Sequence, residues 1–235
     1  MVQKRDEHKE PVIRAFVALP GETLVEAAAR LLPGSGLFVS RAGKEIATNN
    51  MNDDHPSQED HLGFLQQYKT ESEIFSLSSG EQVSIQKYFL HFDLWRGAKP
   101  EFDFGQKPIL AFEGKACFAE LAILRMFLKH GWDGAWVETY GGVHFLRSMP
   151  NTWSLKSEHI QIPADKEDLL KRIWKAGDTR ACFDVLVWSG ADIFFCEAKR
   201  LKKDRLNEAQ KKFIQGALAC GISPSQFLIA EWDLL

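Results

Sequence analysis

The stretch FDVLVWSGADIFFCEAK, residues 183–199, decides the fold of this chain. Two apolar runs that are typical of β-strands flank Ser189–Asp192, a short segment of turn-forming residues. We therefore predict a β-hairpin. Its first strand has an acid near the start, Asp184, and its second strand ends in a Glu-x-Lys sequence.

The register of this hairpin would bring Asp184 beside Glu197. Because side chains alternate between the two faces of a strand, Glu197 and Lys199 should point the same way. Two carboxylates and an amine at the end of a sheet can hold a hard cation and activate a water molecule. The sequence thus predicts a site for Mg²⁺ or Mn²⁺.

The segment that follows the hairpin is basic. Between Glu197 and Lys212 there are seven Lys or Arg and three Asp or Glu, in a chain whose formal net charge is −3. Positive charge next to a metal site suits a phosphate-rich ligand such as nucleic acid. The alternative is an ordinary solvated face. The residues expected to contact nucleic acid are Arg200, Lys202, Lys203, Arg205, Lys211 and Lys212.

Together these motifs resemble the VRR-NUC branch of the PD-(D/E)-x-K nucleases, which have a restriction-endonuclease-like fold. The resemblance covers about half of the chain, from Glu113 to Trp232. The matching motifs are Phe183-Asp184, Glu197-Ala198-Lys199, Asp204-Arg205-Leu206 and Gln210. Phe183 stands where that family usually has proline, a change that removes no metal ligand. The resemblance implies a divalent-metal-dependent endonuclease that acts on DNA rather than RNA.

The resemblance also implies a role for each residue of the motifs. Asp184 and Glu197 would bind Mg²⁺ or Mn²⁺, and the backbone carbonyl of Ala198 would be a further oxygen ligand. Lys199 would hold the attacking water or stabilise the transition state. Gln210 would help to position that water.

An upstream acid of the same superfamily is matched by Glu120, which would complete the metal shell directly or through water. Glu120 lies on or beside the apolar face of a predicted helix, where a carboxylate needs a partner. The alternative is a solvent-exposed position at the edge of that face. Glu138, on a predicted strand, is a second candidate that we rank below Glu120.

Residues 111–235 are predicted to form an α/β domain with a restriction-endonuclease-like core, a small mixed β-sheet flanked by helices. Helical spacing of apolar residues and helix-ending glycines predict the helices Ala116–His130, Asp165–Ala176 and Asn207–Cys220. Besides the hairpin, strands are expected at Ala135–Tyr140 and Gln226–Trp232.

Residues 1–110 are expected to form an additional N-terminal region of unknown role. A strand at Val12–Leu19, a helix at Gly21–Leu32 and a polar loop near residues 48–61 are expected within it. Leu62–Tyr68 and Val83–Trp95 have mixed patterns that predict neither helix nor strand.

Composition bounds the class of protein. No run of about 18 apolar residues is present, so we expect no membrane span. The first ten residues are charged and lack an apolar signal core, which favours a cytoplasmic protein. The four cysteines lie in apolar runs and form no C-x-x-C, as expected of buried free thiols in a reducing compartment.

Two other functions stay open. One is a catalytically inert, nuclease-like fold that binds nucleic acid or serves as an adaptor. The other is a module for a partner that is not nucleic acid, with the N-terminal region as the active part. Since many nucleases of this type cut as dimers, a homodimer is also considered.

Overall fold

The computed structural model describes residues 62–235 except 103, 105–106, 153 and 203–204. The strand, helix and loop expected before residue 62 lie outside this part. The described strands are β1 (Glu73–Ser76), β2 (Gln82–Leu94), β3 (Leu110–Phe112), β4 (Lys115–Cys117), β5 (Asp133–Glu138), β6 (His144–Leu146), β7 (Val185–Ser189), β8 (Asp192–Arg200) and β9 (Phe227–Leu234). The helices are α3 (Ala119–Lys129), α4 (Ala164–Gly177) and α5 (Glu208–Ala219), with short 3-10 turns η1 (Gly63–Tyr68), η2 (Leu155–Ser157) and η3 (Pro224–Gln226).

The strands form one nine-stranded sheet with the order β4-β3-β2-β9-β8-β7-β5-β6, and β1 pairs with β2. The sheet is mixed: β9 runs parallel to both β2 and β8, whereas the pairs of the hairpin and of the edges are antiparallel. The prediction of an α/β fold with a mixed sheet flanked by helices is therefore confirmed, although the sheet is larger than expected.

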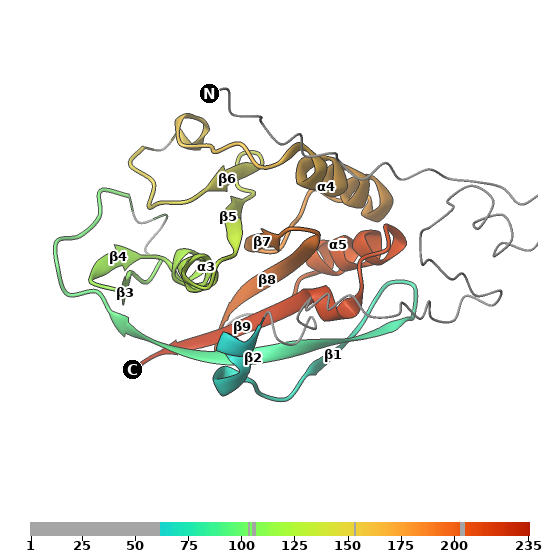
Figure 1. The fold of residues 1–235 in the computed structure, drawn as a ribbon, viewed down its shortest axis with the longest axis horizontal. Coiled ribbons are helices and arrows are strands. Elements are labelled where there is room, and N and C mark those ends of the chain that lie inside the picture. Colours follow the sequence, from blue (N-terminus) through green and yellow to red (C-terminus); the bar gives the residue numbers. More distant parts are fainter. Residues whose placement is uncertain (1–61, 103, 105–106, 153, 203–204) are drawn as a thin grey trace, which may run out of the picture. The chain divides into compact units, whose positions relative to one another are not determined.

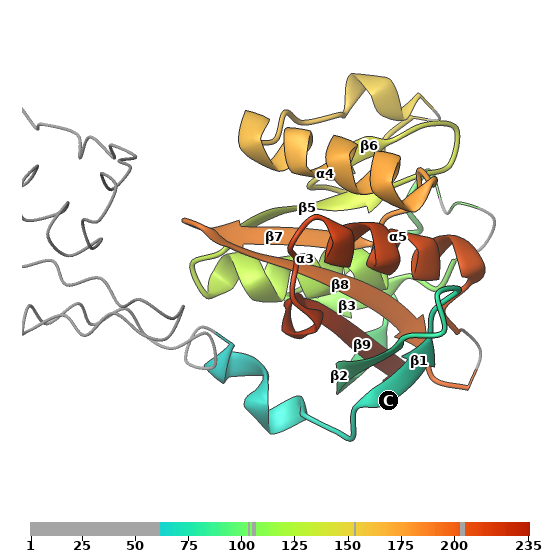
Figure 2. The same cartoon turned by 90° about the vertical axis from the view of Figure 1, so that its right-hand side faces the viewer.

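Helices cover both faces of the sheet, as the two views in Figures 1 and 2 show. The sheet has a hydrophobic core on each face, and successive side chains of β7 belong alternately to the two cores. Val187 packs in the core under α3 with Leu124, and Leu186 packs in the core under α4 and α5 with Phe213. All four of these side chains are fully buried. The continuous apolar run of β7 is thus explained by burial on both faces.

The longest described strand, β2, lies between β3 and β9 and pairs with β9 from Gln86↔Leu228 to Phe92↔Leu234. It belongs to the segment whose pattern predicts neither helix nor strand. The pairing of β2 with β3 carries the sheet across residue 110, the predicted boundary between the N-terminal region and the α/β domain.

The start of the first predicted helix needs correction. Ala116 and Cys117 belong to β4, which pairs with β3, and α3 begins only at Ala119. Apolar residues at helical spacing continue into β4, so the pattern alone does not mark this boundary. The other two predicted helices agree with α4 and α5 to within one residue at each end.

All four cysteines are free, as predicted. Cys117, Cys182 and Cys196 are buried, whereas Cys220 is half-buried. Burial raises the pKa of the Cys117 thiol to about 11 and that of Cys182 well above its ordinary value. Among the described helices, none combines the length and the apolar character that crossing a bilayer requires.

Candidate active site

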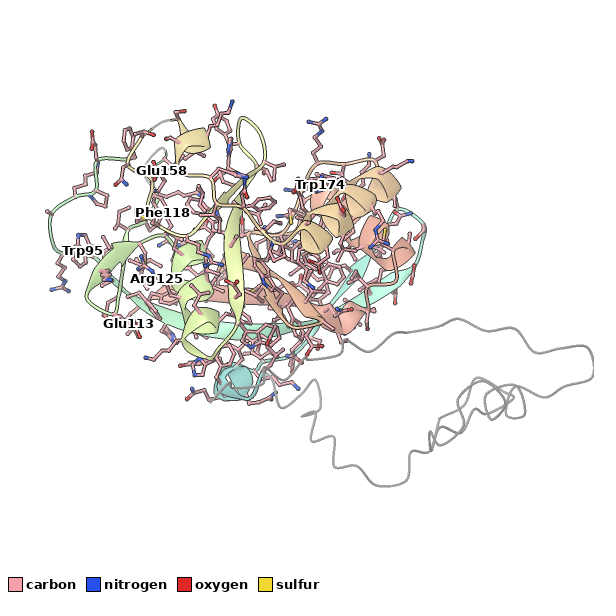
Figure 3. All side chains as sticks on the ribbon, turned by 45° about the horizontal axis from the view of Figure 1, so that its top comes forward. Trp95, Glu113, Phe118, Arg125, Glu158 and Trp174 are labelled. Atoms are coloured by element: carbon pink, nitrogen blue, oxygen red, sulfur yellow. The ribbon has the colours of Figure 1, made fainter. Side chains whose placement is uncertain are left out.

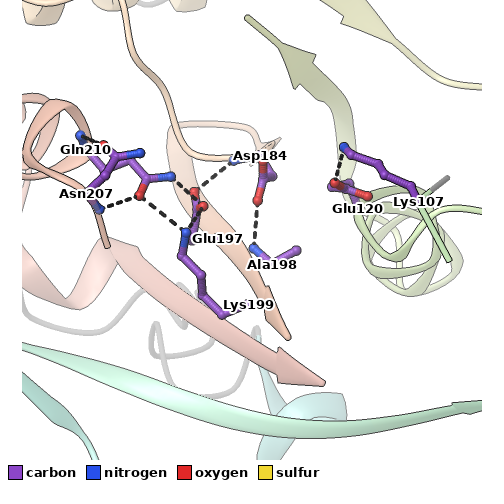
Figure 4. Close-up of polar contacts among 8 residues, drawn as sticks. All are labelled: Lys107, Glu120, Asp184, Glu197, Ala198, Lys199, Asn207 and Gln210. Atoms are coloured by element: carbon purple, nitrogen blue, oxygen red, sulfur yellow. Dashed lines mark hydrogen bonds and ion pairs between the residues drawn. The ribbon is translucent and has the colours of Figure 1, made fainter. Parts of the chain in front are cut away.

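The β7–β8 hairpin places Asp184 next to Glu197. Val185 pairs with Cys196 in this hairpin. Asp184, directly before Val185, therefore lies opposite Glu197, directly after Cys196. The backbone N–H of Asp184 donates to Glu197 Oε2 at 3.3 Å. The backbone N–H of Ala198 donates to Asp184 Oδ2 at 2.9 Å, as Figure 4 shows. Backbone groups therefore fix how the two carboxylates lie relative to each other.

Glu197 is the most buried acid of the site, with only 2% of its surface exposed. Its Oε1 atom lies 2.8 Å from Lys199 Nζ, which confirms that the two side chains share a face of β8. Oε1 also accepts a hydrogen bond from Gln210 Nε2. A buried carboxylate needs such partners, because its loss of hydration is otherwise uncompensated.

Gln210 is buried in the first turn of α5, where a capping box holds it. Its backbone N–H donates to Asn207 Oδ1 at 2.9 Å, and its Oε1 accepts from the Asn207 backbone N–H at 3.0 Å. Lys199 Nζ donates to the same Oε1 at 3.3 Å. With its oxygen engaged in this way, the amide NH₂ group points to Glu197. Asn207 is not among the predicted site residues, although N-x-x-Q at a helix start signals a capping box.

The electrostatics of the pair favour protonation. Burial, followed by the charge of Glu197, raises the pKa of Asp184 well above its ordinary range. Burial also raises the pKa of Glu197, although Lys199 opposes this shift. Two acids in these surroundings cannot both ionise without a cost, and a bound cation would offset that cost.

Glu120 lies in the first turn of α3 and is buried, as expected for a residue on the apolar face of its helix. Its charge contributes to the raised pKa of Asp184. However, its Oε1 atom lies 2.8 Å from Lys107 Nζ. Figure 4 shows this ion pair on one side of Asp184, with Lys199 and Gln210 on the other. Lys107 lies outside the described helices and strands, and no pattern in the sequence connects it to the site.

The donor set suits a hard cation, but its geometry is incomplete. Carboxylate oxygens and a backbone carbonyl are the ligands that Mg²⁺ and Mn²⁺ prefer. Within the part of the chain that the structure describes, no three His, Cys, Asp or Glu side chains are grouped closely enough to hold a metal ion. Asp184 and Glu197 meet as predicted, whereas Glu120 is engaged by Lys107.

A cavity of about 130 Å³ opens beside Glu120 and Ala198. Arg200, at the end of β8, lines this cavity, and its guanidinium lies 5.5 Å from the ring of Trp232. Lys107 also lines this cavity. The cavity therefore has positive charge next to the acids of the site.

The remaining predicted nucleic-acid contacts follow β8. Lys211 is half-buried and pairs with Glu208 at 2.8 Å. Three are exposed: Lys202, Arg205 and Lys212. Lys203 lies outside the described residues. Glu138, the lower-ranked acid, ends β5 and accepts a hydrogen bond from the backbone N–H of Tyr140 at 2.8 Å.

Comparisons of this chain with protein-family models, with curated proteins and with solved structures found no match.

Proposed function

We propose that this chain is a divalent-metal-dependent nuclease that hydrolyses phosphodiester bonds in DNA and is built on a restriction-endonuclease-like core. One observation carries the proposal: Asp184 and Glu197 lie side by side at the end of a hairpin, and Lys199 and Gln210 both contact the Glu197 carboxylate. The acids can hold a metal ion that activates a water, and the ammonium and amide groups are placed where they can act on that water or on a phosphate oxygen.

The metal ligands would be Asp184, Glu197 and the carbonyl oxygen of Ala198, joined by Glu120. When bound, Mg²⁺ or Mn²⁺ would lower the pKa of a coordinated water and neutralise charge on the scissile phosphate. The buried, mutually repelling carboxylates support this assignment, because their raised pKa values mark a place where positive charge is favourable.

Lys199 would act on the water or on the phosphate. Its ammonium group contacts both Glu197 Oε1 and Gln210 Oε1, so the side chain is already positioned next to the acids. Gln210 would be a positioning residue, since its amide contacts both Glu197 and Lys199. Preorganised donors of this kind lower the barrier because they need not reorient during the reaction.

The basic residues after β8 would bind the DNA backbone, a contact that fixes register and carries no sequence information. They are Arg200, Lys202, Lys203, Arg205, Lys211 and Lys212.

A cleavage assay on linear and branched DNAs, with Mg²⁺ or with EDTA, tests the proposal. We expect Mg²⁺-dependent cleavage by the unaltered chain and a loss of about 100-fold or more in Asp184→Ala and in Lys199→Ala. Lys129→Ala is the matched control, since Lys129 pairs with Glu113 on an exposed surface. Full cleavage by both site variants would eliminate this mechanism.

A second function, an inert nuclease-like protein that binds nucleic acid, is favoured by the partners the acids already have. Glu197 is paired with Lys199 and Glu120 with Lys107. If this function is correct, calorimetric titration with Mn²⁺ gives no binding heat, while DNA binding at low salt is retained.

A further inference from the structure

Lys107 is the charged residue next to the acids for which the proposed function has no role. Its Nζ atom lies 2.8 Å from Glu120 Oε1 and 5.6 Å from the ring centres of both Phe118 and Trp136. A cation over aromatic faces is stabilised, and more so when it is partly removed from water. The lysine side chain is 39% exposed and the Glu120 side chain 11%. The ammonium group is therefore held by one carboxylate and two aromatic rings.

The charge of this ammonium group acts on several acids. Burial opposes the charged form of Lys107, but Glu120 and, to a smaller extent, Asp184 and Glu138 outweigh burial, so its pKa is raised. Lys107 also acts on Asp184: its positive charge lowers the pKa of Asp184, although burial raises that pKa by more. Lys107 therefore remains charged at neutral pH and faces the acidic end of the sheet.

We propose that Lys107 is a built-in counter-ion of the site and that a divalent cation binds by displacing its ammonium group from Glu120. This inference rests on the proposed function, because it takes Glu120, Asp184 and Glu197 as the metal ligands. A metal ion bound to Glu120 Oε1 would strongly repel an ammonium group held at the same oxygen, where Lys107 Nζ now lies. In the exchange, Glu120 turns from Lys107 Nζ to the metal.

The exchange accounts for two features of the site. Glu120 lies near Asp184 but does not form a group of three acids with Asp184 and Glu197, because its carboxylate is engaged by Lys107. The metal-free chain also tolerates several acids close together, because Lys107 neutralises part of their charge. Once released, the ammonium group lies on the wall of the neighbouring cavity, where a phosphate oxygen can be its next partner.

The chain contains a second Lys–Glu ion pair with one partner on α3, which serves as a matched control. Lys129, the last residue of α3, lies 2.7 Å from Glu113, and both side chains are more than half exposed. Glu113 belongs to the turn between β3 and β4, whereas Phe118 lies directly before α3; both are labelled in Figure 3. Lys129→Met therefore removes the same charge as Lys107→Met but leaves the site unchanged.

Calorimetric titration with Mn²⁺ in the absence of DNA, combined with thermal unfolding, tests the exchange. Lys107→Met should bind Mn²⁺ about tenfold more tightly than the unaltered chain, because the metal no longer competes with an ammonium group. Its melting temperature should be lower without metal and should recover when Mn²⁺ is added. Lys107→Arg, which keeps the charge, and Lys129→Met should both bind Mn²⁺ like the unaltered chain.

The outcomes separate the exchange from the function on which it rests. In one outcome, the unaltered chain binds Mn²⁺, Asp184→Asn does not, and Lys107→Met binds Mn²⁺ no more tightly than the unaltered chain. That outcome overturns the exchange but leaves the nuclease proposal standing. Absence of Mn²⁺ binding in both the unaltered chain and Lys107→Met overturns both. Should Lys107→Met not fold, Lys107→Gln takes its place in the same titration.

Discussion

A carboxylate that is 2% exposed, as Glu197 is, is stable in a folded chain only when other groups compensate its charge. Lys199 and Gln210 provide that compensation on Oε1. Asp184 accepts a hydrogen bond from the Ala198 backbone N–H, and no ammonium group of the described residues forms an ion pair with it, whereas Lys199 pairs with Glu197. Of the two acids, Asp184 is therefore the one whose ionisation is costly, and its charge is the one that a cation would stabilise most.

The stability of the metal-free chain should depend on the ionisation of Asp184. Because its folded-state pKa is raised above the unfolded value of about 3.9, its contribution is full below about pH 4 and is lost as the pH rises through the folded pKa. Asp184→Asn cannot ionise. The free energy of unfolding of the variant, relative to the unaltered chain, should therefore increase as the pH rises from 4 to 8.

Urea unfolding in EDTA at several pH values measures this difference. A difference that is constant with pH, or that favours the unaltered chain more at pH 8 than at pH 4, would contradict the assignment of the shift to Asp184.

At the scale of the element, the start of α5 connects helix stability with the site. The capping box between Asn207 and Gln210 satisfies backbone N–H groups of the first turn and also fixes the amide that contacts Glu197. η3 begins with a second capping box, between Ser223 and Gln226, which does not contact the acids. Of these two capping boxes in the described part of the chain, the one at the start of α5 contacts the site and the one at η3 does not.

Asn207→Ala should therefore affect both stability and cleavage. We expect a loss of about 1 kcal/mol in the free energy of unfolding and a lower kcat, because Gln210 loses its fixed orientation. Ser223→Ala should have a similar or smaller effect on stability and leave kcat unchanged. Equal kcat values in the two variants would show that Gln210 needs no such support.

The elements themselves were predictable to different degrees. The hairpin and the last two helices follow from local patterns, since side-chain alternation and helical spacing need only neighbouring residues. The pattern of β2 is interrupted by consecutive half-buried positions, and its partner β9 lies more than a hundred residues later. Parallel pairing over such a distance leaves no local signal, so the sequence predicts neither β2 nor its pairing with β9.

The same distinction applies to the site. The meeting of Asp184 and Glu197 follows from hairpin register, and the burial of Gln210 follows from its position between Leu206 and Phe213. Lys107 could not be predicted, because a loop residue reaches a helix only through the tertiary structure. The ion pair with Glu120 therefore appears only once the whole sheet is assembled.

At the scale of the whole molecule, charge is unevenly distributed. The chain carries a net charge of −3, yet the segment after β8 is basic. An acidic protein is repelled by DNA except where positive charge is concentrated. The basic segment should therefore determine how DNA is oriented relative to the acids.

Salt dependence tests this orientation. In EDTA, where no metal-dependent cleavage occurs, the DNA affinity of the chain should fall steeply as salt rises. Lys202→Ala and Lys212→Ala should each reduce the slope of log K against log salt by about one, whereas Lys129→Ala should leave it unchanged. Identical slopes in all three variants would place DNA on another surface.

The most direct test of the account is X-ray diffraction from crystals soaked in Mn²⁺, with the ion located by its anomalous scattering. We predict one Mn²⁺ within about 2.5 Å of carboxylate oxygens of both Asp184 and Glu197, with Glu120 turned away from Lys107. An empty site at saturating Mn²⁺, or an ion bound only elsewhere, would contradict the claim that these acids form a metal centre.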